Sequence, residues 1–299
     1  MKHFHICCDG SFGNRYSGLI GGITLSRLCD LPVKVSWPNT QACRAGFFEL
    51  FSKENNLEAS DTNIREYYSI GEQYSLLSCD ASYLEFFKTS GRLEPSSLNV
   101  ESFRRFVNSS DKSVFYYTPL LYDWIPEEEI KQTIKDLKFN DEVLANVGNF
   151  LDENKLRRGY YGIHLRMTDF VNIESFDVDY WIGVVRNKSD KKFFVCSDDP
   201  NTEARFDDLP NAFSYAKKYK TEKFIPEGDW HHPYIDGDGR HTVFNVERGV
   251  EHVKEAVVDF ILLALSNPFN TGKQSTFLKM AKRVGTAIRC SLLLSLPMV

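Results

Sequence analysis

Polar side chains appear abruptly in residues 162–169, Gly-Ile-His-Leu-Arg-Met-Thr-Asp, where the apolar pattern of a buried strand ends. Arg166 stands at that end, and a guanidinium can grip a diphosphate through paired, charge-assisted hydrogen bonds in a way that lysine cannot. An ion pair with Asp169 that closes the loop is the alternative. His164 faces opposite to Leu165 along the strand, so it is either a binding residue or a hydrogen-bonded core histidine. The motif predicts a diphosphate site at Arg166.

A second strand, residues 193–197, leads into two adjacent carboxylates and a proline. Asp199 is suited to capping the next helix, with Pro200 in its first turn. Asp198, at the strand end, either faces a ligand or holds Arg166. Two metal ligands would also fit here, but no histidine or third acid has a matching spacing. We therefore expect neither a metal ion nor another cofactor.

The segment 255–265 is apolar almost all round, which predicts a buried helix, and it contains Asp259. A buried carboxylate needs a partner or a bound ligand to offset its desolvation. Two N–H bonds from a guanine edge would supply such a partner, and an arginine of the protein is the alternative.

Small hydroxyl residues, Ser275 and Thr276, followed by Phe277, enter a final predicted helix after Gly272-Lys273. This is not a nucleoside-triphosphate loop, because the earlier glycine and the hydroxyl residue directly after the lysine are missing. Hydroxyl and N–H groups at such a helix start can still hold phosphate oxygens. The segment therefore predicts phosphate contacts.

The turn Asp-Gly-Ser-Phe-Gly-Asn-Arg, residues 9–15, leads from a short strand into a helix. Its glycines, Gly13 among them, let the backbone approach a ligand, and the helix start offers N–H groups to an anion. The turn is not the G-x-G-x-x-G fingerprint of dinucleotide binding. A tight turn in which Asn14 caps the helix is the alternative.

Alternating strands and helices must position these groups, and apolar periodicity distinguishes the two. The expected strands are residues 3–8, 32–37, 160–165, 193–197 and 212–219, and the expected helices are residues 14–29, 44–51, 126–137, 141–151 and 179–186. This alternation predicts an α/β fold of two facing Rossmann-like domains with parallel sheets. We expect an acceptor-side domain over residues 1–155 and a donor-binding domain over residues 156–299. Ligands of such sheets bind beyond the carboxyl ends of the strands, here in an interdomain cleft.

Composition and charge exclude several classes of protein. The formal net charge of −5 argues against nucleic-acid binding, and the lysines at 217, 218, 220 and 223 are interpreted as a solvated face. The seven cysteines are odd in number and include no C-x-x-C pair, which predicts reduced core residues in a cytoplasmic protein. No apolar stretch approaches the ~20 residues of a transmembrane helix.

Five segments, in this order, resemble motifs of the inverting GT-B fucosyltransferases. That group includes protein O-fucosyltransferases, core α-1,6-fucosyltransferases and bacterial nodulation fucosyltransferases. The segments are residues 10–15 (a glycine-asparagine loop), 164–169 (an H-x-R-x-x-D donor motif), 197–200 (an acidic turn), and 255–263 and 275–277 (two C-terminal donor motifs). Residues 39–158 carry little of the resemblance.

The resemblance implies an inverting, metal-independent transfer of fucose from GDP-fucose to a hydroxyl of a glycan or another acceptor. In that family the arginine of the H-x-R motif holds the diphosphate, and the aspartate of the apolar helix reads guanine. These roles pass to Arg166 and Asp259. The remaining donor contacts that we expect are Gly13, His164, Asp198, Ser275, Thr276 and Phe277.

The loop asparagine of the family, here Asn14, lies near the reacting sugar in some members. The general base is open among Asp169, Asp9 and Glu49, and we choose Asp169. Met167 stands where many members have a second arginine, which argues against α-1,6 transfer. Two alternatives remain: the same fold with another nucleotide-sugar, and a non-catalytic relative that binds carbohydrate or nucleotide.

Overall fold

The structure, a computed structural model, divides by its internal contacts into two compact units. The first comprises Met1–Thr40 and Gly46–Asn140, and the second comprises Gln41–Ala45 and Asp141–Val299. The structure describes residues 1–62, 74–78, 92–93, 96, 98–118, 120–167, 177–218, 223, 225, 227, 234–235, 241–242, 247–268 and 275–296.

The first unit contains a sheet with the strand order β3-β2-β1-β6-β4-β5, in which every pair is parallel. All four residues of β1 are buried, as a central strand covered on both faces requires. The strands are β1 (Phe4–Cys7), β2 (Val33–Ser36), β3 (Glu58–Ser60), β4 (Tyr74–Ser78), β5 (Arg92–Leu93) and β6 (Ser113–Tyr117). The helices are α1 (Phe12–Leu28), α2 (Phe47–Leu50), the 3₁₀ turn η1 (Lys53–Asn55), α4 (Val100–Asn108) and α5 (Glu127–Asp136).

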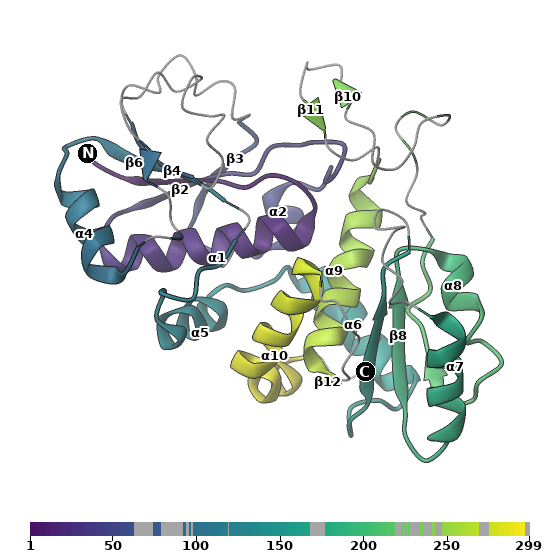
Figure 1. The fold of residues 1–299 in the computed structure, drawn as a ribbon. Helices are drawn as coiled ribbons and strands as arrows, with labels where there is room; N and C mark the ends of the chain where they lie inside the picture. Colours follow the sequence, from purple (N-terminus) through teal and green to yellow (C-terminus); the bar gives the residue numbers. More distant parts are fainter. Residues whose placement is uncertain are drawn as a thin grey trace. The chain divides into compact units, whose positions relative to one another are not determined.

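Helix α1 packs directly on β1 and β2, and nearly all of its residues up to Ser26 are buried (Figure 1). Two of its glycines make this close approach possible. A Cβ atom at Gly18 would lie 2.6 Å from the backbone oxygen of Thr118, and one at Gly22 would lie 2.6 Å from Cδ1 of Ile6. A side chain at either position would push the helix away from its neighbours, so these glycines fix how the helix sits on the sheet.

The second unit contains a four-stranded parallel sheet with the order β12-β7-β8-β9. Alternate residues of its strands face opposite sides. Ile163 and Val195 belong to an apolar core shared with Trp181 of α7, whereas Gly162 faces Leu263 at the end of α9. The strands are β7 (Tyr161–Leu165), β8 (Phe193–Ser197), β9 (Ala212–Phe213) and β12 (Asn267–Pro268), and a separate antiparallel pair joins β10 (Tyr234–Ile235) to β11 (His241–Thr242).

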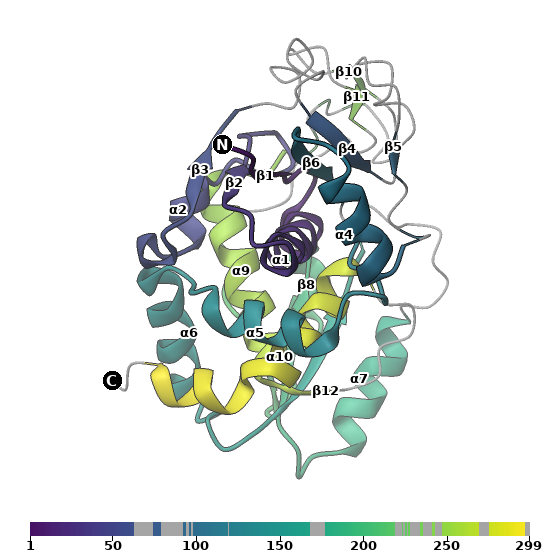
Figure 2. The same ribbon diagram turned by 90° about the vertical axis from the view of Figure 1, so that its left-hand side faces the viewer.

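Helices cover both faces of this sheet, with α7 and α8 on one side and α6 and α9 on the other (Figure 1). Helix α10 lies alongside α9 in both views (Figures 1 and 2). Helix α6, which the expected boundary near residue 155 assigned to the first part, packs against α9 of the second unit. The helices are α6 (Asp141–Glu153), α7 (Val178–Asn187), α8 (Pro200–Ala204), α9 (Val250–Leu265) and α10 (Thr276–Ser295).

The predicted α/β architecture with parallel sheets is confirmed, and the differences concern where elements begin and end. The strand predicted over 212–219 is wrong beyond Phe213, because the chain leaves the sheet there and Lys217 turns toward buried carboxylates. The helix predicted over 44–51 is limited to α2, which starts after Gly46. Within the described part of the chain, no helix has the length and apolarity that a membrane span requires.

The contact between Gly18 and Thr118 leads to a stability prediction. Gly18→Ala should lower the free energy of unfolding by about 1–3 kcal/mol, because the new methyl group overlaps a backbone oxygen that cannot rotate away. Gly183→Ala in α7 is the control, since a Cβ there meets nothing within 4 Å. This substitution should raise the free energy of unfolding by about 0.5–1 kcal/mol. Urea denaturation measures both, and a Gly18→Ala protein as stable as the wild type would refute the close packing.

Candidate functional site

The loops that follow β7 and β8 begin side by side, because Leu165 pairs with Ser197 in the sheet. Their next residues are Arg166 and Asp198. One carboxylate oxygen of Asp198 accepts the Met167 N–H at 2.6 Å, and the other lies 4.0 Å from Nε of Arg166. That separation is too long for a hydrogen bond, so the two side chains form a loose ion pair, 16% and 18% exposed. Asp198 therefore holds the loop that carries Arg166. Of the two roles expected for Asp198, facing a ligand or holding Arg166, this contact corresponds to the second.

Asp199 caps helix α8, and Pro200 occupies the first turn. Its carboxylate accepts the N–H groups of Asn201 at 3.2 Å and Thr202 at 3.1 Å, and the Thr202 hydroxyl at 2.7 Å. The capping role predicted for Asp199 is confirmed. Both adjacent acids are thus engaged by donors of the protein. Asp169, the expected partner or base, lies outside the described residues.

Asp259 is buried on α9 and meets a cation, Lys217, rather than the arginine that the sequence suggested. The Lys217 ammonium lies 2.9 Å from Oδ2 of Asp259 and also pairs with Glu203 of α8. Lys217 is only 7% exposed, so its interpretation as part of a solvated lysine face is wrong. Two carboxylates offset the desolvation of the ammonium, which is why a lysine is stable there.

The same cluster reaches the end of β8, because Glu203 accepts the Ser197 N–H at 2.7 Å. Burial raises the pKa of the Asp259 and Glu203 carboxyls, and Lys217 opposes this only in part. Burial acts to lower the pKa of Lys217, but its two carboxylate partners raise it overall. Oδ1 of Asp259 is buried and has no hydrogen-bond partner among the residues that the structure describes. A buried acceptor without a donor is costly, so this oxygen is the unsatisfied group of the cluster.

Residues 275–277, at the start of α10, also reach β7. The ring of Phe277, in the first turn of α10, stacks on His164 at 5.3 Å and meets Phe260 of α9 edge-on at 5.3 Å. Ser275 is the N-cap of α10, and its hydroxyl accepts the Leu278 N–H at 3.3 Å. Thr276 follows as the first helical residue. The structure thus brings His164 and residues 275–277 together around one aromatic stack.

In the first unit, the glycine turn has a structural reason for its sequence. Gly10 has φ +80°, and its Cα faces the side chain of Asn14, whose Nδ2 would lie 3.3 Å from a Cβ there. Ser11 is the N-cap of α1, and the Asn14 N–H donates to the Ser11 carbonyl at 3.0 Å. The alternative that Asn14 caps the helix is therefore wrong, because α1 begins two residues earlier. Gly13 is buried inside the first helical turn.

Arg15 was not singled out from the sequence, yet it anchors this turn. It is fully buried, and it donates to the Gly10 carbonyl at 2.7 Å, the Pro38 carbonyl at 2.7 Å and the Thr40 hydroxyl at 2.8 Å. Its guanidinium also lies over the Trp37 ring at 5.2 Å. The turn after β1 is therefore tied to the end of β2.

Two of the three candidate bases have structural partners in this unit. Asp9 accepts the Gly10 N–H at 2.6 Å and the Tyr117 hydroxyl at 3.2 Å. Glu49 accepts the Gly46 N–H at 2.6 Å at the start of α2. Each carboxylate thus supports a local turn.

Lys217 and Glu203 are the site residues that the motifs did not reveal. Phe213, Tyr215 and Lys217 alternate in the sequence, and an extended chain with this spacing would place the lysine on the same side as two aromatic residues. The alternation was a usable signal for a buried lysine. Glu203 carries no comparable signal, since nothing local distinguishes it from a solvent-facing helix residue.

No protein-family model matches the chain, and no curated protein matches its sequence. Similar folds occur among solved structures. The α-1,6-fucosyltransferase NodZ soaked with GDP-fucose aligns with a TM-score of 0.55 at 14% identity, over 95% of this chain and 93% of that one. NodZ from Bradyrhizobium, in a further structure, gives 0.54 at 14% identity, over 94% and 93%. POFUT1 in complex with GDP-fucose gives 0.51 at 13% identity, over 95% and 94%.

These alignments extend over almost the whole chain, so they are not confined to the segments that carried the sequence resemblance. At identities this low, a structural likeness is a statement about fold, and function has to be argued from the site itself. The fold expected from the resemblance to GT-B fucosyltransferases is therefore confirmed: the chain has the fold of NodZ and POFUT1.

Proposed function

We propose that the chain is an inverting, metal-independent glycosyltransferase that moves fucose from GDP-fucose to a hydroxyl of a glycan or another acceptor. The observation that carries this proposal is the buried carboxylate of Asp259, one oxygen of which has no donor among the described residues. Asp259 belongs to a cluster that is attached to Ser197 at the end of β8. Ser197 directly precedes Asp198 and pairs with Leu165, the residue before Arg166. The solved structures of similar fold include complexes with GDP-fucose.

In the proposed donor complex, Oδ1 of Asp259 accepts N–H groups of the guanine edge. Lys217 already holds the other oxygen at 2.9 Å, so the carboxylate is oriented before the nucleotide arrives. The phosphates meet Arg166 and the start of α10, where Ser275, Thr276 and the N–H groups of the first turn offer donors. The stacked rings of Phe277 and His164 form an aromatic wall beside these donors.

In the proposed reaction, the acceptor oxygen attacks the anomeric carbon of fucose from the face opposite to the diphosphate. The bond between that carbon and the phosphate oxygen breaks, its electron pair leaves with GDP, and the configuration inverts. Negative charge grows on the diphosphate, and Arg166 stabilises it. Because the ion pair with Asp198 is loose, the guanidinium can turn to the phosphate without losing a close hydrogen bond to that acid.

The acceptor proton needs a base, which we assign to Asp169 because Asp9 and Glu49 already hold local turns. Asn14 of the first unit is assigned to the transferred sugar. Metal independence is supported by the state of the two adjacent acids: Asp198 and Asp199 accept hydrogen bonds from protein N–H groups, and Arg166 supplies the positive charge that a divalent ion would otherwise provide.

A second candidate is the same chemistry with another nucleotide-sugar, because the argument for guanine depends on one carboxylate. A third is a non-catalytic relative that binds GDP without releasing fucose. Calorimetric titration with GDP and UDP distinguishes the first two, and assay of fucose release against a panel of acceptors identifies the third.

The role of Arg166 is tested by removing its guanidinium. Arg166→Ala should lower kcat by roughly 100- to 1000-fold, the usual effect of losing one donor to a developing anion. Arg166→Lys should recover only part of this rate, because lysine keeps the charge without the fork. Arg186→Ala, an exposed arginine at the end of α7, should leave kcat within about twofold. Retention of more than about a tenth of the rate in Arg166→Ala, with an intact fold by circular dichroism, contradicts the assignment.

The role of Asp259 is tested by GDP affinity. Asp259→Asn should weaken GDP binding by at least about tenfold, since hydrogen bonds to a charged acceptor contribute roughly 1.5–3 kcal/mol. Glu251→Gln, on the exposed side of the same helix, should change it little. Because burial raises the pKa of Asp259, wild-type affinity should fall on acidification at a higher pH than for an ordinary aspartate. Equal binding of GDP and UDP, with no effect of Asp259→Asn, would remove the guanine assignment.

A further inference from the structure

A pocket of about 830 Å³ opens at the amino ends of β7 and β8, the edge of the sheet opposite to Arg166. Tyr161 begins β7, Lys192 immediately precedes β8, and Asn267, the first residue of β12, pairs with Tyr161. This volume falls within the range of about 300–1,000 Å³ that is usual for small-molecule sites. The pocket is built entirely from the second unit, and the proposed donor site does not use it.

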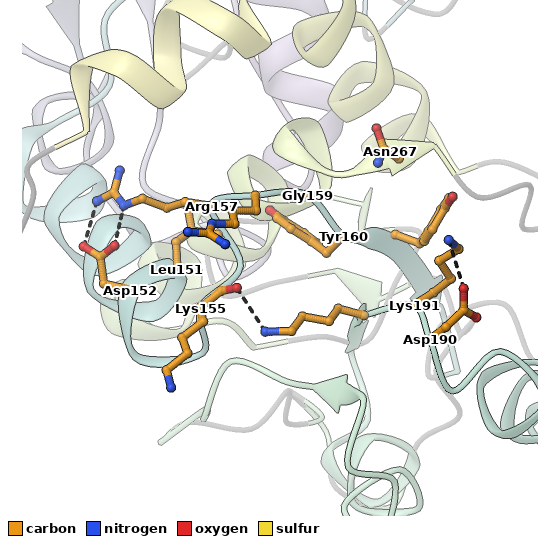
Figure 3. A pocket seen from close by; sticks show the side chains of 12 residues that line it. Leu151, Asp152, Lys155, Arg157, Gly159, Tyr160, Asp190, Lys191 and Asn267 are labelled. Atoms are coloured by element: carbon orange, nitrogen blue, oxygen red, sulfur yellow. Dashed lines mark hydrogen bonds and ion pairs between the residues drawn. The ribbon is translucent and has the colours of Figure 1, made fainter.

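The lining of this pocket is strongly basic. Two ion pairs, Arg157 with Asp152 and Lys191 with Asp190, lie on opposite sides of it (Figure 3). The remaining charges are all positive. Five cations against two carboxylates leave an excess of three positive charges in a chain whose net charge is −5; the charged lining residues are Asp152, Lys155, Arg157, Arg158, Asp190, Lys191 and Lys192.

One of the three excess charges has a structural use. The Lys192 ammonium donates to the carbonyls of Asn154 and Lys155, both at 3.0 Å, and so satisfies the end of helix α6. Lys155 and Arg158 differ from Lys192 in this respect. Both are exposed, and neither side chain forms a hydrogen bond or ion pair with any residue in the described part of the chain. The fold therefore does not account for these two charges.

Lys155 also occupies a backbone position that usually belongs to glycine. The Leu156 N–H donates to the Leu151 carbonyl at 2.7 Å, which is the defining bond of a Schellman ending of α6. Such an ending puts the residue before Leu156 in the left-handed region, and Lys155 has φ 54°. The other non-glycine residues with positive φ in the described ranges are Asp30 and Asn56, which belong to the types that tolerate it. A lysine thus stands where glycine would be less strained.

We propose that this pocket is a second ligand site that binds an oligoanion, a compound carrying at least two phosphate or sulfate groups, through Lys155 and Arg158. Two unpaired cations beside the fixed Lys192 ammonium suit a ligand with several negative groups better than a single small ion. The strained lysine is explained if its charge is used for binding, since residues kept against local stability commonly serve function.

The test uses the full chain with the Arg166→Ala substitution, which weakens anion binding at the proposed donor site. Inorganic pyrophosphate and sucrose octasulfate are titrated separately by calorimetry, which distinguishes a phosphate source from a sulfated saccharide. Lys155→Gly and Arg158→Ser should each weaken binding by at least about fivefold, and raised salt should weaken it further. Lys188→Ser, an exposed lysine outside the pocket, should leave affinity within about twofold.

Lys155→Gly has a second readout. Its unfolding temperature should equal or exceed that of the parent protein, because glycine relieves the left-handed position. Binding of either probe that depends on both residues, together with unchanged or increased stability, supports the proposal. Three results overturn it: no binding of either probe, binding that ignores both substitutions, or a lower unfolding temperature for Lys155→Gly, which would give the lysine a structural role instead.

Discussion

The ammonium of Lys217, buried between Glu203 and Asp259, is the interaction on which the proposed nucleotide site depends. It joins helix α8, the segment after β9 and helix α9. Because Glu203 also accepts the Ser197 N–H, this cluster is connected to the end of β8. Removal of this one cation would leave two buried carboxylates without their counter-charge, which is far more costly than the loss of a surface pair. The geometry around Asp259 is therefore fixed by charge as well as by packing.

Each unit contains a buried cation near a candidate site, but the two cations differ in their partners. Among the described residues, Arg15 in the first unit donates to neutral carbonyl and hydroxyl oxygens alone, and these bonds fix the turn after β1 without a carboxylate partner. Lys217 in the second unit faces two carboxylates, and one oxygen of Asp259 lacks a donor within the part of the chain that the structure describes. The first arrangement is complete, whereas the second can still accept hydrogen bonds from a ligand.

The sequence was sufficient wherever the deciding interaction was local. Apolar runs predicted β7 and β8 closely, and the Asp199-Pro200 pair predicted the cap of α8. It was insufficient where a partner far along the chain decided the outcome. Lys217 looks like one of several solvated lysines until Asp259, forty-two residues later in the numbering, is placed beside it. The same long-range contact explains why the strand predicted over 212–219 ends at Phe213.

The net charge of −5 describes the whole chain and does not show how charge is arranged in the second unit. At the carboxyl edge of the sheet, the cations Arg166 and Lys217 both stand beside carboxylates, which keeps them oriented. At the amino edge, positive charge exceeds negative charge within one pocket. A compensated cation suits a site that must bind a nucleotide and release it, because part of the attraction is already satisfied by the protein. An uncompensated pair suits retention of a ligand that does not react, so the two edges fit different kinds of binding.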